Sequence, residues 1–302
     1  MGYIWGVEQL QYIVDLFRDG DPTVSAALER YFLDNGPEPL QNLRECYRME
    51  MDPSRKAVLG RMLGKYGKKA AIDGLRRMAE QCKDGECGML EAGYLLSSIT
   101  DPAIAREDYL ERIMPPAVAV MAEVSDAKTG LENVHLLNHV FYNRYGFTSS
   151  NPFDMSLESS LLMEVLDKRK GSPLALSLVY FIIAQIAGLP IYPLCFTGGF
   201  VPVYVENDRV LFNINVFHKG EIFIENDISK LVKNQASALG VNVDIGEAKV
   251  RKDASILVMY LEFLQMLYSN AGNSTVQMDI EDAIEALGGT RFLTVEEDDD
   301  NW

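Results

Sequence analysis

The sequence contains little cysteine, and its four cysteines are scattered. They stand at positions 46, 82, 87 and 195 of 302 residues, too few for the disulfide framework of a small secreted domain. Cys82 and Cys87 are close, but no second cysteine pair or nearby histidine completes the tetrahedral ligand set of structural zinc. We therefore expect reduced thiols, no metal site and no other cofactor.

Basic residues are also scarce relative to acidic ones. There are 28 Lys and Arg against 44 Asp and Glu, which gives a formal net charge of -16. Such a charge repels phosphate backbones and anionic membrane surfaces, so we expect neither nucleic acid nor membrane as a partner. Part of the excess lies in the run Glu296 to Asp300, which predicts an acidic, disordered tail over 290–302.

No hydrophobic run is long enough to cross a bilayer. The longest, Leu174 to Ile186, is interrupted by Ser177 and Gln185 and is too short for a hydrocarbon layer of ~30 Å. The first ten residues have neither a basic leader nor an apolar block followed by a cleavage site of small residues. We expect a cytoplasmic protein.

The chain up to about residue 125 has the periodicity of helices. Asp21-Pro22, Asp52-Pro53 and Asp101-Pro102 each place a capping carboxylate before a proline, which predicts three helix starts. The first two are 31 residues apart, and this offset aligns Gly36 with Gly67, where we expect a helix to end in each unit.

Helix pairs that follow one another in this way are typical of stacked repeats. The expected second helices cover 39–49 and 69–82, and an imperfect third pair covers 86–98 and 101–113. The pattern resembles short HEAT-type repeats. We predict a HEAT-like helical region over 1–115, whose last helix is broken by the prolines of Met114-Pro115-Pro116.

Beyond this boundary the pattern becomes mixed. We expect helices over 131–145, 157–168 and 173–187, then strands over 191–196, 200–205, 209–215 and 221–224, with a hairpin turn at 206–208. Two further helices, 254–268 and 275–287, close the chain. The predicted fold class is α+β, mostly helical, with a small antiparallel sheet.

Residues 165–180, with the sequence VLDKRKGSPLALSLVY, and AGLP at 187–190 resemble the transglutaminase-like superfamily, and most closely its SirB-like bacterial branch. Leu137-Asn138, Phe141, Gly146-Phe147 and Asn151 to Asp154 fit the same branch. The resemblance implies a transglutaminase-like, papain-like core over 116–252, followed by C-terminal helices over 253–289.

The same resemblance implies a cysteine, a histidine and an aspartate that act together, because imidazole deprotonates the thiol and the carboxylate orients the imidazole. The matching positions here hold Pro173, Gly199 and Asn215. The resemblance therefore predicts an inactive core rather than an enzyme.

Two hypotheses follow. In the first, the former cleft binds a protein, a peptide or a small ligand, and Gly199 leaves room for a close approach. The candidate cleft residues are Ser172, Tyr180, Cys195, Gly198, Gly199, Phe200 and His218. In the second, a relocated pair of Cys195 and His218 acts as a cysteine hydrolase or acyltransferase, which requires a thiol of lowered pKa. His135 and His139 have metal-ligand spacing on one helix face, but two histidines alone favour packing or surface exposure.

Overall fold

The structure is a computed structural model that describes residues 14, 17, 21–82, 86–151, 156–197, 199–223, 244–289 and 292. Gly198 and, apart from Phe292, the predicted tail 290–302 lie outside the described residues. The fold is mostly helical with a small antiparallel sheet, which confirms the predicted class. None of the described helices has both the length and the apolarity needed to cross a bilayer.

The N-terminal helices begin where their capping carboxylates predict. The Asp21 carboxylate accepts hydrogen bonds from the amides of Thr23 and Val24, and that of Asp52 accepts one from the Arg55 amide. Each bond satisfies an amide that the first helical turn leaves without a partner. The elements of this part are α2 (Pro22–Asp34), α3 (Glu38–Met49), α4 (Pro53–Met62), the π-helical segment η1 (Leu63–Gly67) and α5 (Lys68–Gln81).

The two glycines aligned by the 31-residue offset differ in conformation. Gly36 has a φ of 78° after the end of α2, whereas Gly67 is helical and the chain continues from α4 through η1 into α5. Gly67 is needed for packing instead, because a Cβ there would lie 3.1 Å from Cβ of Pro102. The predicted helix end at Gly67 is wrong, and HEAT-like repeats are not confirmed.

The third predicted helix start and the predicted break at the double proline are also wrong. The Asp101 carboxylate caps a turn by accepting from the Ala103 amide, and α7 (Arg106–Glu123) begins only at Arg106. Pro115 and Pro116 lie inside α7. The stripe of buried residues on both sides of them packs the helix into the core, which offsets the missing amide hydrogen bonds.

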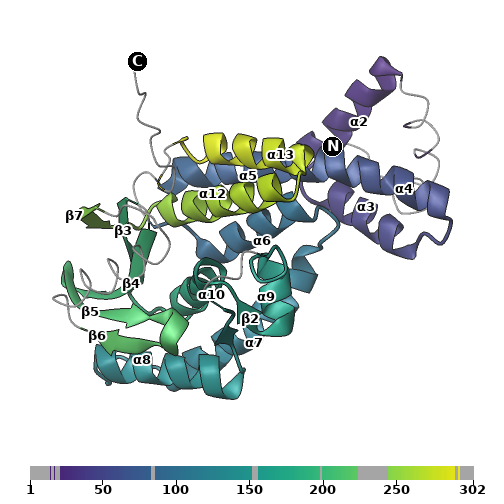
Figure 1. The fold of residues 1–302 in the computed structure, drawn as a ribbon. Coiled ribbons are helices and arrows are strands. Elements are labelled where there is room, and N and C mark those ends of the chain that lie inside the picture. Colours follow the sequence, from purple (N-terminus) through teal and green to yellow (C-terminus); the bar gives the residue numbers. More distant parts are fainter. Residues whose placement is uncertain are drawn as a thin grey trace, which may run out of the picture.

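The remaining helices surround α10 (Pro173–Ile186), which contacts α6, α7, α9 and α12 and lies near the centre of the molecule (Figure 1). These helices are α6 (Met89–Thr100), α8 (Gly130–Asn138), η3 (His139–Arg144), α9 (Leu162–Lys168), α12 (Ser255–Asn270) and α13 (Ser274–Ala286). α13 packs against both α5 and α12, so a C-terminal helix covers an N-terminal one (Figure 1).

The sheet has the strand order β6-β5-β4-β3-β7, and every pair in it is antiparallel. Its strands are β3 (Ile191–Thr197), β4 (Gly199–Glu206), β5 (Arg209–Asn215), β6 (Glu221–Phe223) and β7 (Asp244–Val250). The turn between β4 and β5 has positive φ at Asn207 and Asp208, as a tight hairpin requires. Strand β7 was not predicted. A separate parallel pair joins β1 (Thr148–Ser149) to β2 (Lys170–Gly171).

The described residues form two large hydrophobic clusters and a third, small one at Phe196 and Val201. The smaller of the two large clusters joins Val14 to residues of α2, α3, α4 and η1, with Phe32 and Tyr66 stacked at its centre. The larger one runs without interruption from α5 to α13 and includes both halves of α7. Packing therefore crosses the predicted boundary at residue 115, and the four-part domain division stays a prediction.

Cys82 and Cys87 form a disulfide, with their Cα atoms 5.0 Å apart. The expectation of reduced thiols is wrong for this pair. Cys82 follows the end of α5, and the chain returns so that the Cys87 amide donates to the Lys252 carbonyl. Cys46 and Cys195 are buried thiols outside this disulfide.

Candidate functional site

Pro173, at the expected nucleophile position, is the first residue of α10, and the turn before it is tightly bonded. The Ser172 amide donates to the Ser159 carbonyl at 2.7 Å, and the Ser160 hydroxyl donates to that of Ser172 at 3.3 Å. The Tyr260 hydroxyl in turn donates to the Ser160 carbonyl at 2.8 Å. Ser160 and Ser172 are buried, so these hydroxyls hold the start of α10 in place.

Asn215, at the expected aspartate position, is the last residue of β5 and has a local structural role. Its Oδ1 accepts a hydrogen bond from the His218 amide at 3.2 Å and so caps the short helix η4 (Val216–His218). The carbonyl of Val216 in that helix accepts from the buried Tyr142 hydroxyl at 2.7 Å. The side-chain oxygen of Asn215 therefore stabilises a turn. At this position the family pattern has an aspartate that orients an imidazole.

Gly199, at the expected histidine position, begins β4 and pairs with Phe196 on β3. A Cβ at this position would lie 3.2 Å from the Phe196 ring, closer than ordinary van der Waals contact. The space beside Gly199 is therefore limited by Phe196. Gly199 and Asn215 both belong to the β4–β5 pair, at the start of one strand and the end of the other.

The candidate cleft residues divide between the interior and the surface. Ser172, Tyr180 and Cys195 are 1%, 0% and 4% exposed, and Phe200 packs against Phe181 with ring centroids 6.0 Å apart. The Tyr180 hydroxyl donates to Asn138 Oδ1 at 2.8 Å, and the Asn138 amide donates to the Gly220 carbonyl at 2.9 Å. Asn138 is one of the residues that carry the family resemblance. Its two hydrogen bonds connect α8 to α10 and to the turn after β5.

Cys195 and His218 do not form a catalytic pair. Strand β4 lies between β3, which carries Cys195, and β5, which ends just before His218. Two strand spacings are about 10 Å, well beyond hydrogen-bond reach. His218 is exposed, with its ring against Phe217.

The electrostatic environment of Cys195 also opposes activation. Burial, aided by Asp253, raises the pKa of its thiol to about 12. A nucleophilic cysteine requires a shift in the other direction, because the thiolate is the reactive form. The burial of Cys195 and the raised pKa of its thiol both count against the enzymatic alternative.

His135 and His139 are exposed, and Nδ1 of His139 lies 3.3 Å from the Asn143 side-chain amide. Across the described residues, no group of three or more His, Cys, Asp or Glu side chains could hold a metal ion.

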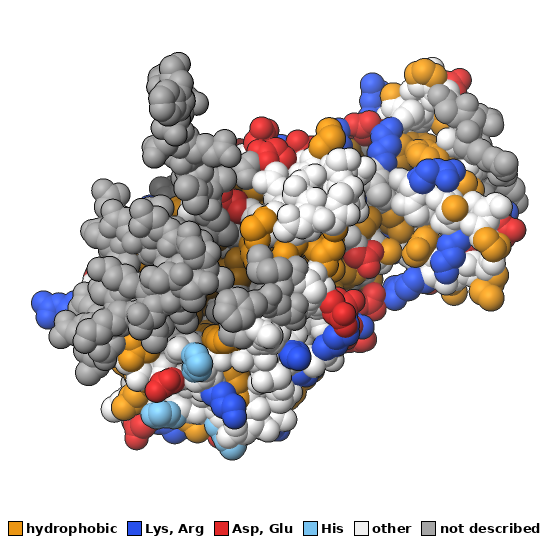
Figure 2. Space-filling model, viewed as in Figure 1, with side chains coloured by type: hydrophobic (Ala, Val, Ile, Leu, Met, Phe, Trp, Pro, Cys, Tyr) orange, Lys and Arg blue, Asp and Glu red, His pale blue; other side chains and the backbone are white. Residues whose placement is uncertain are grey.

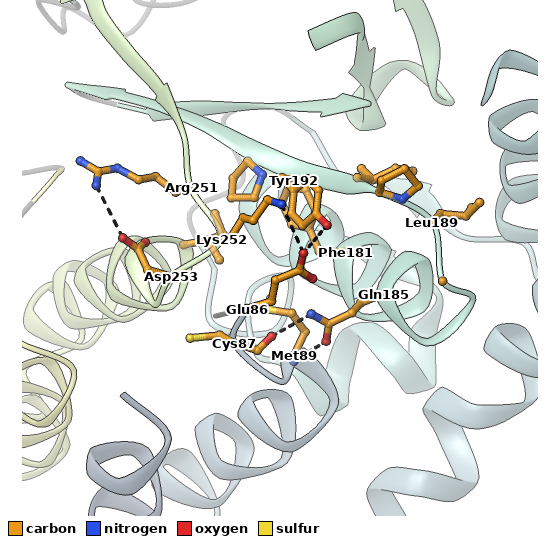
Figure 3. Close-up of a pocket in the computed structure, with 15 residues that line it drawn as sticks. Glu86, Cys87, Met89, Phe181, Gln185, Leu189, Tyr192, Arg251, Lys252 and Asp253 are labelled. Carbon is orange, nitrogen blue, oxygen red and sulfur yellow. Dashed lines mark hydrogen bonds and ion pairs between the residues drawn. The ribbon is translucent and has the colours of Figure 1, made fainter. Parts of the chain in front are cut away.

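A pocket that sequence reasoning missed lies at the carboxyl end of α10, against β3 and residues 251–253 (Figure 3). Its volume is about 140 Å³, and Phe181 and Leu189 contribute apolar walls. The one sequence signal was the Gly188-Leu189-Pro190 turn, which belongs to the block that resembles the transglutaminase-like superfamily.

Polar side chains around this α10 pocket pair with one another, except at Arg251, whose buried Nε has no hydrogen-bond partner in the described part of the chain. The Tyr192 hydroxyl donates to the Glu86 carboxylate at 2.5 Å, and Lys252 lies 3.4 Å from the same carboxylate and 4.6 Å from the Tyr192 ring (Figure 3). The Gln185 side chain accepts from the Met89 amide at 2.7 Å and donates to the Cys87 carbonyl at 2.8 Å. The lining thus combines paired polar side chains with apolar walls.

A comparison with protein families matches the part of the chain that contains α10 and the sheet. Residues 107–256 match the family model described as transglutaminase-like superfamily, so this part of the chain is a transglutaminase-like domain. It covers the elements from α7 to the start of α12, including α10 and the whole sheet.

The relatives place the domain in the SirB-like group. Protein SirB1 of Salmonella typhimurium and that of Salmonella typhi are each 29% identical over 143 residues, which covers 47% of this chain and 52% of theirs. UPF0162 protein PM0557 of Pasteurella multocida is 36% identical over 93 residues, 30% of this chain and 35% of its own. The chain thus spans about half or less of the length of these relatives. No solved structure gives a significant match.

Proposed function

We propose that this chain is a catalytically inactive transglutaminase-like protein that acts as a binding scaffold. The observation that carries the proposal is Pro173 at the start of α10, where the reaction of the family requires a thiol. Gly199 and Asn215 support it, since neither side chain can serve as a general base. The buried Cys195 supplies no replacement.

The partner that fits this proposal is a protein or peptide, bound in the cytoplasm without nucleic acid or membrane. The net charge of -16 supports the two exclusions. The Cys82–Cys87 disulfide argues against the cytoplasm, where such bonds are rare, so location is best tested directly by fractionation of cells.

An amine-incorporation assay with a fluorescent primary amine and a glutamine-rich protein acceptor tests the loss of activity. We expect no incorporation above the buffer control, because the chain has no thiolate at the start of α10. Denatured protein serves as the matched blank. Incorporation that disappears in Cys195→Ala would overturn the proposal.

The binding role has its own test at Gly199. Crosslinking in cells, followed by affinity capture, should recover less of the main partner with Gly199→Leu than with wild type, because the added side chain meets Phe196 and shifts the start of β4. Gly64→Leu is the control, since a Cβ there meets nothing within 4 Å. Equal capture by both variants, with equal thermal stability, would exclude the start of β4 as the binding surface.

A further inference from the structure

A second pocket lies between the smaller hydrophobic cluster and the larger one. Its volume is about 360 Å³, within the range of small-molecule sites. Its walls come from α2, α3, η1, α5, α6 and α7, and Phe32, Leu40 and Leu95 form part of its apolar surface. We call it the interhelix pocket. It is distinct from the α10 pocket and shares none of the candidate cleft residues.

The part of the chain that forms most of this pocket differs in charge from the whole molecule. Residues 21–82 contain eleven Lys and Arg against nine Asp and Glu, while the complete chain has a net charge of -16. Figure 2 shows Lys and Arg side chains gathered over the N-terminal helices, on the right of the view. This end of an acidic protein therefore attracts anions more strongly than the rest.

Arg44 on α3 is the unusual residue of the interhelix pocket. Its side chain lines the pocket although the residue is only 5% exposed, and its Nε donates to the Pro102 carbonyl at 3.0 Å. Within the described part of the chain, no carboxylate lies within 4.0 Å of its guanidinium. A buried cation without a counter-ion is costly, and a bound anion would remove that cost.

The carboxylates of the lining are already paired elsewhere. Glu91 accepts from Arg106 at 3.1 and 3.2 Å, and Asp73 pairs at 2.5 Å with Arg76, which lies outside the lining. Arg77 also lines the pocket, is exposed, and has no carboxylate partner among the described residues. Arg44 and Arg77 thus remain as the cations of the pocket.

We infer that the interhelix pocket binds an oxyanion, a carboxylate or a phosphate, carried by a small and partly apolar molecule. Arginine suits this role because its planar fork of donors matches both groups, while the apolar walls accept the rest of the molecule. The inference does not depend on whether the transglutaminase-like positions are inactive, because the pocket contains none of them.

Binding can be measured on the full chain with three probes of similar shape: benzoate, phenyl phosphate and neutral benzamide. We expect at least one anion, but not benzamide, to bind in ligand-observed NMR and to raise the melting temperature. The stronger anion identifies the carboxylate or the phosphate source. Arg77→Gln should weaken that binding about tenfold, the effect of one charge-assisted contact, and Arg44→Met should abolish it.

Arg48→Gln is the control, because Arg48 is exposed on the same helix, one turn after Arg44, and lies outside the pocket lining. It removes the same charge and should leave binding unchanged. If Arg44→Met does not fold, Arg77→Gln still tests the inference, because Arg77 is exposed and its substitution should leave the fold intact. Binding of neither anion, or equal weakening by Arg48→Gln and Arg77→Gln, would overturn the inference.

Discussion

At the residue scale, each of the three positions that match the catalytic residues of the family has a structural role. Pro173 begins a helix, Asn215 caps a turn and Gly199 gives room to Phe196. The sequence alone predicts that no nucleophile stands at position 173, because residue type decides whether a nucleophile is present. It could not predict the replacement roles, because these depend on partners such as Phe196 and the His218 amide that only the folded chain brings close.

The four cysteines allow a direct check of this part of the structure. Native protein should react only slowly with iodoacetamide, because Cys46 and Cys195 are buried and their thiol pKa values are raised to about 11 and about 12. Unfolding should add two labels without a reductant and four with one, since Cys82 and Cys87 are bonded. Intact-mass spectrometry counts the labels. Fast labelling of native Cys195 would contradict its burial.

The same thiols make stability depend on pH in a defined direction. Their pKa values in the folded chain lie above the ordinary value of 9.0, so the unfolded chain loses these protons first as the pH rises. The contribution of the thiols should be constant below about pH 9 and decrease above it, as should that of buried tyrosines such as Tyr142, whose pKa is also raised. Urea unfolding at several pH values measures this, and stability that increases above pH 9 would contradict it.

At the scale of elements, local signals predicted most helices and four of the five strands of the sheet. The failures occurred where a distant contact decided the outcome. Gly67 leaves room for Pro102 inside a continuous helical run, and α7 passes through two prolines while its buried stripe packs into the core. Strand β7 pairs with β3, about fifty residues earlier in the chain, and no local sequence pattern predicts this pairing.

The caps make a quantitative prediction at this scale. Asp52→Ala removes the only side-chain oxygen that caps α4 in the described structure and should lower the free energy of unfolding by about 1 kcal/mol. Asp34→Ala is the matched control, because Asp34 is the exposed last residue of α2, where a negative charge opposes the helix dipole. Urea denaturation compares the two variants, and an equal loss in both would argue against capping as the cause.

At the scale of the whole molecule, the two large hydrophobic clusters are joined by one continuous run of helix from α4 through η1 to α5. The resemblance to the transglutaminase-like superfamily agrees with the family match, and it says nothing of where packing begins. The family match starts at 107, whereas the larger core already includes Leu75 on α5 and Leu96 on α6. A sequence boundary based on the family is therefore too late for the packing.

Fragments can measure this difference. A fragment of residues 116–302 cuts α7 in two and removes Leu75, Leu96 and Tyr109, all at most 1% exposed, so it should not form a cooperatively folded core. A fragment of residues 68–302 keeps the entire larger cluster and should unfold cooperatively, with a near-ultraviolet circular dichroism spectrum of packed aromatics. If 116–302 instead melts at the same temperature as 68–302, α5, α6 and the first half of α7 are an accessory layer. In that case the boundary predicted at residue 115 is the structural one.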